Sequence, residues 1–112
     1  MDKSEQSIPI INEVSFDEVL KAGDRFIALI YASWCPFFVR FLPVFVRITQ
    51  ELTNRCFMVR DDQEMIADKY KVNVIPTVLF FENGVVSKRL DGILGVGLHE
   101  KQLVEFIRDC KL

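Results

Sequence analysis

The segment "RFIALIYA" (residues 25–32) is an almost unbroken apolar run, and it constrains the fold more than any other stretch of the sequence. A strand that faces water on one side alternates apolar and polar residues, whereas a strand covered on both sides is apolar throughout. The run therefore predicts a central strand that is buried on both faces of its sheet. The chain has 112 residues, half of them apolar and ten of them Phe, which suits one globular domain over residues 1–112.

The residues before this run predict a short strand and a helix. "IPIINEV" (8–14) indicates a short first strand. In the segment "SFDEVLKAG" that follows it, Ser15 is expected as the helix N-cap, with Glu18 three residues on to complete a capping box. Gly23 is expected to end this helix.

The residues after the run predict a long helix, a hairpin and three further elements. Apolar residues at spacings of three and four indicate a helix from residue 36 to about residue 54, which Pro43 should kink. The segment "TVLFFENGVVSKRL" (77–90) reads as two strands around the tight turn of Asn83 and Gly84. The remaining elements are a strand at 56–61, a short helix at 64–72 and an amphipathic helix at 99–110. The order βαβαβαββα predicts an α/β fold, a central mixed sheet with helices on both faces.

Charge and composition argue against several classes of partner. The net charge is −2 and like charges never run beyond two or three residues, so we expect no nucleic acid and no anionic membrane as partner. No apolar run approaches the roughly 18 residues of a membrane span, and "MDKSEQSIPI" has no segment apolar enough for a secretory signal. Three dispersed cysteines and a single histidine, His99, show no ligand spacing, so we expect no metal and no cofactor. An odd cysteine count without a signal predicts a reducing, cytoplasmic location.

Cys35 lies where the central strand ends and the long helix begins. Pro36 suits an early helical position, because its missing N–H would have no partner there in any case. A thiol at a helix N-terminus faces unpaired N–H groups and the positive end of the helix dipole, and both favour the thiolate. Because only the thiolate attacks a disulfide, Cys35 is the candidate nucleophile.

Several motifs, taken in order, resemble the thioredoxin family over nearly the whole chain. "ASWC" matches the family's strand-to-helix junction, and Pro43 matches the proline inside its second helix. "VIPT" matches the loop of a cis-proline, which would be Pro76, while "FFENG" matches the hairpin. Gly92, in "DGI", matches a glycine of the substrate-facing surface. The resemblance implies a thioredoxin fold and thiol–disulfide exchange.

The resemblance also implies a binding site around Cys35. Trp34, Pro76 and Gly92 with Ile93 would surround the reactive sulfur and receive an extended substrate segment. The backbone of Ile75 would pair with that segment as an added strand. Two residues next to the cysteine would extend the docking surface, namely Pro36 and Phe37.

Two departures from the family pattern bear on the mechanism. The family's motif is W-C-G-P-C, whereas this chain has W-C-P-F-F, so Phe38 stands where the resolving cysteine would be. The family also has a buried aspartate six residues before the first cysteine, and here that position is Leu29. We expect Phe38 to pack inward over Cys35, where it would shield the sulfur and oppose the effect of the helix terminus. The sequence alone does not decide which effect is larger.

The other polar and sulfur-bearing residues are expected to have structural roles. Free cysteine is often buried, so Cys56, at the start of a strand, and Cys110, on the apolar side of the last helix, are interpreted as packing residues. His99 is interpreted as a solvated residue at the start of that helix. A charged cluster after the strand at 56–61 is interpreted as a solvated loop; it consists of Arg60, Asp61, Asp62 and Glu64.

The leading hypothesis is a thioredoxin-like exchange protein with Cys35 as its lone nucleophile and an external thiol as resolver. Its partners would be protein thiols or disulfides, or small thiols, and it would be a monomer, with a Cys35-linked dimer as an option on oxidation. An alternative is a redox-silent module that binds extended peptides in the groove between Trp34 and Pro76. A monothiol-glutaredoxin-like protein ranks last, because the rest of the chain matches the thioredoxin pattern. A C-P-F-C parent in which Phe38 was introduced also stays open, although Leu29 argues mildly against it.

Overall fold

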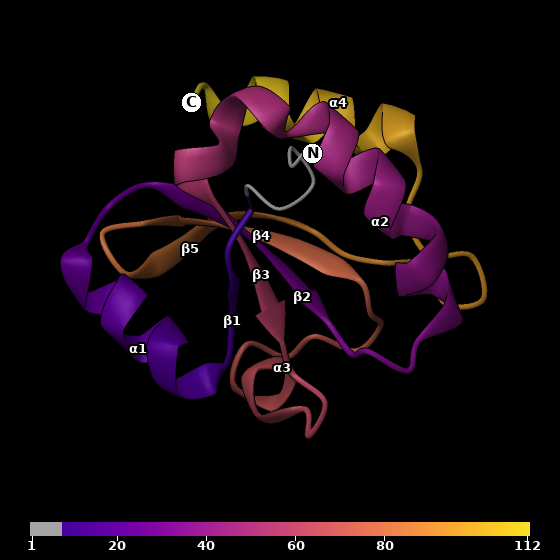
Figure 1. The fold of residues 1–112 in the computed structure, drawn as a ribbon, viewed down its shortest axis with the longest axis horizontal. Helices are drawn as coiled ribbons and strands as arrows, with labels where there is room; N and C mark the ends of the chain where they lie inside the picture. The colour runs from indigo at the N-terminus through magenta and orange to yellow at the C-terminus, as the bar shows by residue number, and fades with distance from the viewer. Residues whose placement is uncertain (1–7) are drawn as a thin grey trace, which may run out of the picture.

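The structure is a computed structural model that describes residues 8–112, with the backbone alone at positions 53 and 54 (Figure 1). Five strands form one sheet in the order β1-β3-β2-β4-β5. They are β1 (Ile10–Ile11), β2 (Phe26–Tyr31), β3 (Cys56–Arg60), β4 (Thr77–Glu82) and β5 (Val85–Leu90). The helices are α1 (Glu13–Ala22), α2 (Pro36–Ile48), α3 (Met65–Lys69) and α4 (Glu100–Cys110).

The central position of β2 confirms the prediction from its apolar run. It pairs parallel with β3 and antiparallel with β4, so the sheet is mixed as expected. All six of its residues are buried. On one face, side chains of β2 pack with those of α2 and α4; on the other, they pack with α1 and α3. Figure 1 shows the same arrangement, with α2 and α4 together on one side of the sheet and α1 and α3 on the other.

The start of the chain differs from the sequence prediction. The first strand covers only Ile10–Ile11, and the N-cap of α1 lies three residues before the predicted one. Asn12 is the N-cap, because its Oδ1 accepts hydrogen bonds from the backbone N–H groups of Val14 (3.1 Å) and Ser15 (3.0 Å). The prediction of Ser15 as the cap was therefore wrong. The predicted end was right, since Gly23 has φ of 75° and closes the helix.

Helix α2 is shorter than predicted. It ends at Ile48, and a 3₁₀ helix covers Gln50–Arg55. Thr49 marks the change, because both its backbone N–H (3.0 Å) and its hydroxyl (2.6 Å) donate to the carbonyl oxygen of Phe45. Pro43 lies inside α2, as the sequence indicated.

The C-terminal hairpin and helix confirm the prediction. Asn83 and Gly84, with φ of 55° and 82°, form the tight turn between β4 and β5. His99 is the exposed N-cap of α4, and its backbone N–H donates to Oε1 of Gln102 (2.8 Å). Within residues 8–112, no helix is both long and apolar enough to cross a membrane.

The charged cluster at the end of β3 is more ordered than a solvated loop. Asp61 is only 2% exposed. Its Oδ1 and Oδ2 accept hydrogen bonds from the backbone N–H groups of Ile66 (3.0 Å) and Ala67 (2.7 Å), in the first turn of α3. A buried carboxylate is stable only with such partners. The interpretation of a solvated loop was therefore wrong for Asp61. Asp62 keeps contact with solvent, but its carboxylate also accepts hydrogen bonds from Ser33, next to the candidate site.

Candidate thiol site

Cys35 lies in the last position of a turn between β2 and α2. Its backbone N–H donates to the carbonyl oxygen of Ala32 (3.2 Å), and its own carbonyl accepts from Val39 (3.2 Å). It is thus the N-cap of α2, with Pro36 as the first helical residue, as predicted. The side chain is only 4% exposed. Its sulfur donates a hydrogen bond to the carbonyl oxygen of Ile75 at 3.6 Å, a bond that requires the proton on sulfur.

The loop that meets Cys35 is tied to the segment after β5. The peptide bond between Ile75 and Pro76 is cis. The hydroxyl of Thr77 donates to the carbonyl oxygen of Val74 (2.6 Å) and accepts from the N–H of Gly92 (3.1 Å). Thr77 thus joins the two loops, a role that the motif "VIPT" contained but sequence reasoning missed.

Position 92 must be glycine because its backbone lies very close to the proline loop. A Cβ atom at this position would lie 2.5 Å from the carbonyl oxygen of Pro76, well inside any real contact. The structure therefore brings together the predicted residues Cys35, Ile75, Pro76 and Gly92.

Phe38 occupies the interior beneath the cysteine turn. It is 6% exposed, and its ring stacks on that of Tyr31 with centroids 4.0 Å apart. The prediction that it packs inward is confirmed. Leu29, fully buried in β2, has Met58 and Val78 as its neighbours on the adjacent strands. The surroundings of Leu29 on the sheet are thus apolar, and no acid–base group lies beside it there.

Trp34 lies at the surface beside a small cavity. Its side chain is 61% exposed. Together with Ile75 it lines a cavity of about 130 Å³, whose other walls include Asp61 and Glu64. The predicted residues Trp34 and Ile75 therefore line the same cavity.

A short loop after β5 forms an apolar rim of the site. Ile93 and Gly97 close the loop through two backbone hydrogen bonds, 3.1 Å and 2.8 Å long. Gly97 rests on Phe37, since a Cβ there would lie 3.2 Å from that residue's Cβ. Ile93 is exposed, and Leu94 at the tip is 84% exposed. Sequence reasoning found Phe37 and Ile93 but missed Leu94, which only its exposure reveals.

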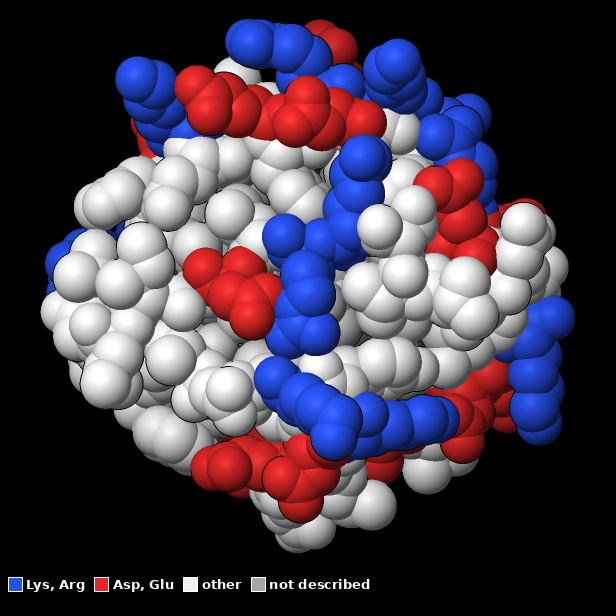
Figure 2. Space-filling view, turned by 180° about the vertical axis from the view of Figure 1, so that it is seen from behind, with Lys and Arg blue, Asp and Glu red and all other residues white. Residues whose placement is uncertain are grey.

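The rear face of the molecule shows how charge is distributed around this loop. In Figure 2, Lys, Arg, Asp and Glu side chains cover the centre, the top and the right of the view. The left-hand part, on the side where the loop between β5 and α4 lies in Figure 1, is mostly uncharged, with Lys or Arg atoms visible only at its outer edge. The rim of the site is thus an apolar surface beside a mixed-charge face.

The other two cysteines are buried away from this site, as predicted. Burial raises the pKa of the Cys56 thiol to about 12, an effect that a hydrogen bond with Thr49 only partly opposes. Burial likewise raises the pKa of Cys110 to about 11. Both thiols therefore stay protonated near neutral pH. Among residues 8–112, no cluster of three or more His, Cys, Asp or Glu side chains is arranged to hold a metal ion.

The fold and the site define an α/β protein with one thiol at a helix N-cap, against a cis-proline loop. The sequence profile of the family described as thioredoxin matches residues 7–109. The thioredoxin of Rickettsia bellii is 30% identical over 104 residues, 88% of this chain and 94% of that protein. The chain therefore belongs to the thioredoxin family.

Other relatives and solved structures agree with this assignment. Thioredoxin Y, chloroplastic, of Oryza sativa is 30% identical over 84 residues, which are 71% of this chain and 50% of that protein. This chain thus spans about half the length of that relative. Mitochondrial thioredoxin 3 from Saccharomyces cerevisiae has a TM-score of 0.74 at 23% identity, covering 96% of this chain and 99% of that one. This likeness supports the thioredoxin fold.

Proposed function

We propose that this protein performs thiol–disulfide exchange through Cys35 as its single nucleophile. The observation that carries this proposal is the place of Cys35 at the N-cap of α2, against the cis-proline loop, while the ring of Phe38 fills the place of a second thiol. The thiolate of Cys35 attacks one sulfur of a target disulfide, the target's S–S bond breaks, and the released thiolate takes up a proton. A mixed disulfide on Cys35 remains.

An external thiol completes the cycle. As a thiolate it attacks the target's sulfur in the mixed disulfide and releases Cys35, so the target is now bonded to the external thiol. A second external thiol then frees the target and leaves the external thiols oxidised. We propose protein thiols or small thiols as these partners and a reducing, cytoplasmic environment as the setting. A dimer linked through Cys35 would arise only under oxidation.

The target segment would dock as an extended strand. The backbone of Ile75 supplies the edge for pairing, and the cavity beside Trp34 accepts a neighbouring side chain. Pro36, Phe37 and Ile93 complete the apolar surface around the sulfur. The exposed apolar side chains of this rim favour apolar target segments, and the guanidinium of Arg40 lies over the Phe37 ring at 5.4 Å.

The first test is treatment with oxidised glutathione. We expect one glutathione adduct, on Cys35, because no internal thiol resolves it, and none on Cys56 or Cys110, whose thiols stay protonated. Mass spectrometry of the intact protein and of its peptides gives the count and the position. Adducts on Cys56 or Cys110 alone would show that the nucleophile is wrongly assigned.

A second candidate function is binding without redox chemistry. It is favoured by the low exposure of Cys35 and by the hydrogen bond that its thiol donates to the carbonyl oxygen of Ile75. In this case the groove beside Trp34 would hold an extended peptide and the thiol would only fill space.

Two variants separate the candidate functions. For exchange, Cys35→Ser should abolish covalent capture of a cystine peptide. For binding alone, Cys35→Ser should retain affinity while Trp34→Ala weakens it by about 1–3 kcal/mol, as buried aromatic contacts do. Non-reducing gels measure capture, and fluorescence titration with a labelled peptide measures affinity. Equal capture by the wild type and the serine variant would contradict exchange.

A further inference from the structure

The turn of residues 32–35 determines how Trp34 and Cys35 are presented. The hydrogen bond from the Cys35 N–H to the carbonyl oxygen of Ala32 closes this turn, with Ser33 and Trp34 as its central residues. Because the Trp34 side chain is largely exposed, its position depends mainly on the backbone that carries it. Whatever orders Ser33 therefore orders the site.

The carboxylate of Asp62 accepts hydrogen bonds from both donors of Ser33, its backbone N–H and its hydroxyl. Oδ1 of Asp62 accepts from the Ser33 N–H at 2.7 Å, and Oδ2 accepts from the Ser33 hydroxyl at 3.0 Å. Oδ2 also accepts from Nε of Arg60 at 2.9 Å. The Ser33 backbone N–H and then Arg60 lower the pKa of Asp62. Hydrogen bonds to an ionised acceptor are stronger than neutral ones.

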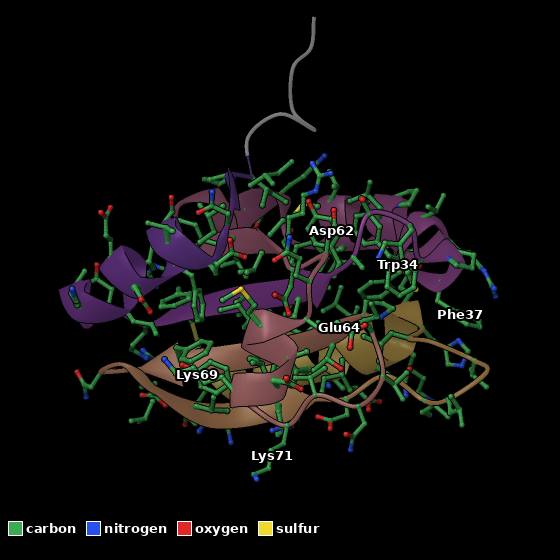
Figure 3. All side chains as sticks on the ribbon, turned by 90° about the horizontal axis from the view of Figure 1, so that it is seen from below. Trp34, Phe37, Asp62, Glu64, Lys69 and Lys71 are labelled. Atoms are coloured by element: carbon green, nitrogen blue, oxygen red, sulfur yellow. The ribbon has the colours of Figure 1, made fainter. Side chains whose placement is uncertain are left out.

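The backbone that carries Asp62 is itself held in place. The N–H of Asp61 donates to the carbonyl oxygen of Tyr31, the last residue of β2, at 2.8 Å. The side chain of Asp61 is bonded to the first turn of α3. In Figure 3, Asp62 and Trp34 lie on the same side of the molecule, with Glu64 further along the loop that carries Asp62. Asp62 thus reaches the turn from a fixed support.

We propose that Asp62 is a positioning residue of the Cys35 site. By holding Ser33, it fixes the turn that places Trp34 at the surface and Cys35 against Ile75. It acts through the backbone of the turn and not on the sulfur. The effect of Asp62 on target capture rests on the proposed function. Its effect on the mobility of the turn at residues 32–35 does not.

The experiment uses two measurements on the full chain. Trp34 is the only tryptophan, so the decay of tryptophan fluorescence anisotropy reports the motion of this turn directly. The second measurement compares the capture rates of two disulfides, a linked dimer of a short uncharged peptide and oxidised glutathione. The peptide disulfide must dock as an extended segment, whereas oxidised glutathione mainly reports the reactivity of the thiol. The ratio of the two capture rates therefore measures docking separately from reactivity.

The variants are Asp62→Ala, Asp62→Asn and the matched control Asp68→Asn. The control removes the same charge with the same substitution, and Asp68 is an exposed residue of α3 outside the cavity beside Trp34. In Asp62→Ala we expect faster local motion of Trp34 and a fall in the peptide-to-glutathione ratio on the order of tenfold, as expected when a site loses its fixed geometry. Asp62→Asn should lie between this variant and the wild type, because its amide oxygen still accepts from Ser33. Asp68→Asn should match the wild type.

Three results would overturn the proposal. The first is unchanged anisotropy decay in Asp62→Ala. The second is faster motion with an unchanged ratio, which would make the contact merely structural. The third is an equal effect of Asp68→Asn and Asp62→Asn, which would assign the effect to charge. If the wild type captures neither disulfide, the proposed function fails, and the anisotropy data still decide whether Asp62 orders the turn.

Discussion

Replacing Phe38 with alanine is expected to lower the free energy of unfolding by about 3–5 kcal/mol, the usual loss for a buried phenylalanine. The Phe38 ring is almost fully buried and stacked on Tyr31, so its removal leaves a cavity and also removes an aromatic pair. Because a whole domain is stable by only about 5–15 kcal/mol, urea denaturation followed by circular dichroism should show a much lower midpoint.

The neighbouring residue gives the control for this prediction. Val39 follows Phe38 in α2 and is exposed, so Val39→Ala should change the unfolding free energy by no more than about 0.5 kcal/mol. An equally small effect of Phe38→Ala would mean that the ring is not part of the core. The position of the missing cysteine would then be vacant, and the account of the site given above would be wrong.

The parts of the fold that the sequence predicted well have strong local causes. The apolar run at 25–32 leaves β2 no position except the centre of a sheet. The turn at Asn83 and Gly84 needs positive φ at two successive residues, and this dipeptide accepts it at low cost. The place of Cys35 at a strand-to-helix junction likewise followed from an apolar run, a proline and a helical repeat.

The predictions that failed depended on competition between neighbouring residues. Asn12 and Ser15 are both good N-caps, and the choice of Asn12 depends on where the chain leaves β1. Asp61 and Asp62 are adjacent residues with the same side chain, so the sequence does not distinguish them. In the structure, however, Asp61 is buried against α3 and Asp62 accepts hydrogen bonds from Ser33. Such assignments require the positions of distant backbone N–H groups, which a local pattern does not contain.

Sequence reasoning about the candidate site was limited in the same way. The resemblance to thioredoxins indicated Pro76 and Gly92, but not that the hydroxyl of Thr77 joins their loops. The exposed tip at Leu94 also escaped notice, because an apolar residue next to a glycine suits either a core or a rim. Only packing distinguishes the two.

Phe38→Cys is expected to restore a dithiol without restoring a fast reductase. Cysteines at positions 35 and 38 lie across the first turn of α2, so they should form a disulfide on mild oxidation. Resolution of a mixed disulfide, however, requires the new thiol to lose its proton in a buried position, which raises a thiol's pKa. Leu29, between Met58 and Val78, provides no carboxylate to accept that proton. Little attacking thiolate would be present at neutral pH.

Adding Leu29→Asp should then accelerate turnover, although an unpartnered buried carboxylate should cost several kcal/mol of stability. The matched control is Leu29→Asn in the same Phe38→Cys background, because asparagine has the same shape and polarity but accepts no proton. Insulin reduction at a fixed concentration of external reductant measures the wild type, the Phe38→Cys variant and the two double variants, and thermal denaturation verifies that each is folded. The aspartate variant should exceed the asparagine variant at neutral pH. The advantage should vanish when the pH rises far enough to ionise the second thiol without help. If Phe38→Cys alone turns over as fast as the aspartate variant, proton transfer does not limit resolution, and the absence of an acid at position 29 has no bearing on the chemistry of this chain.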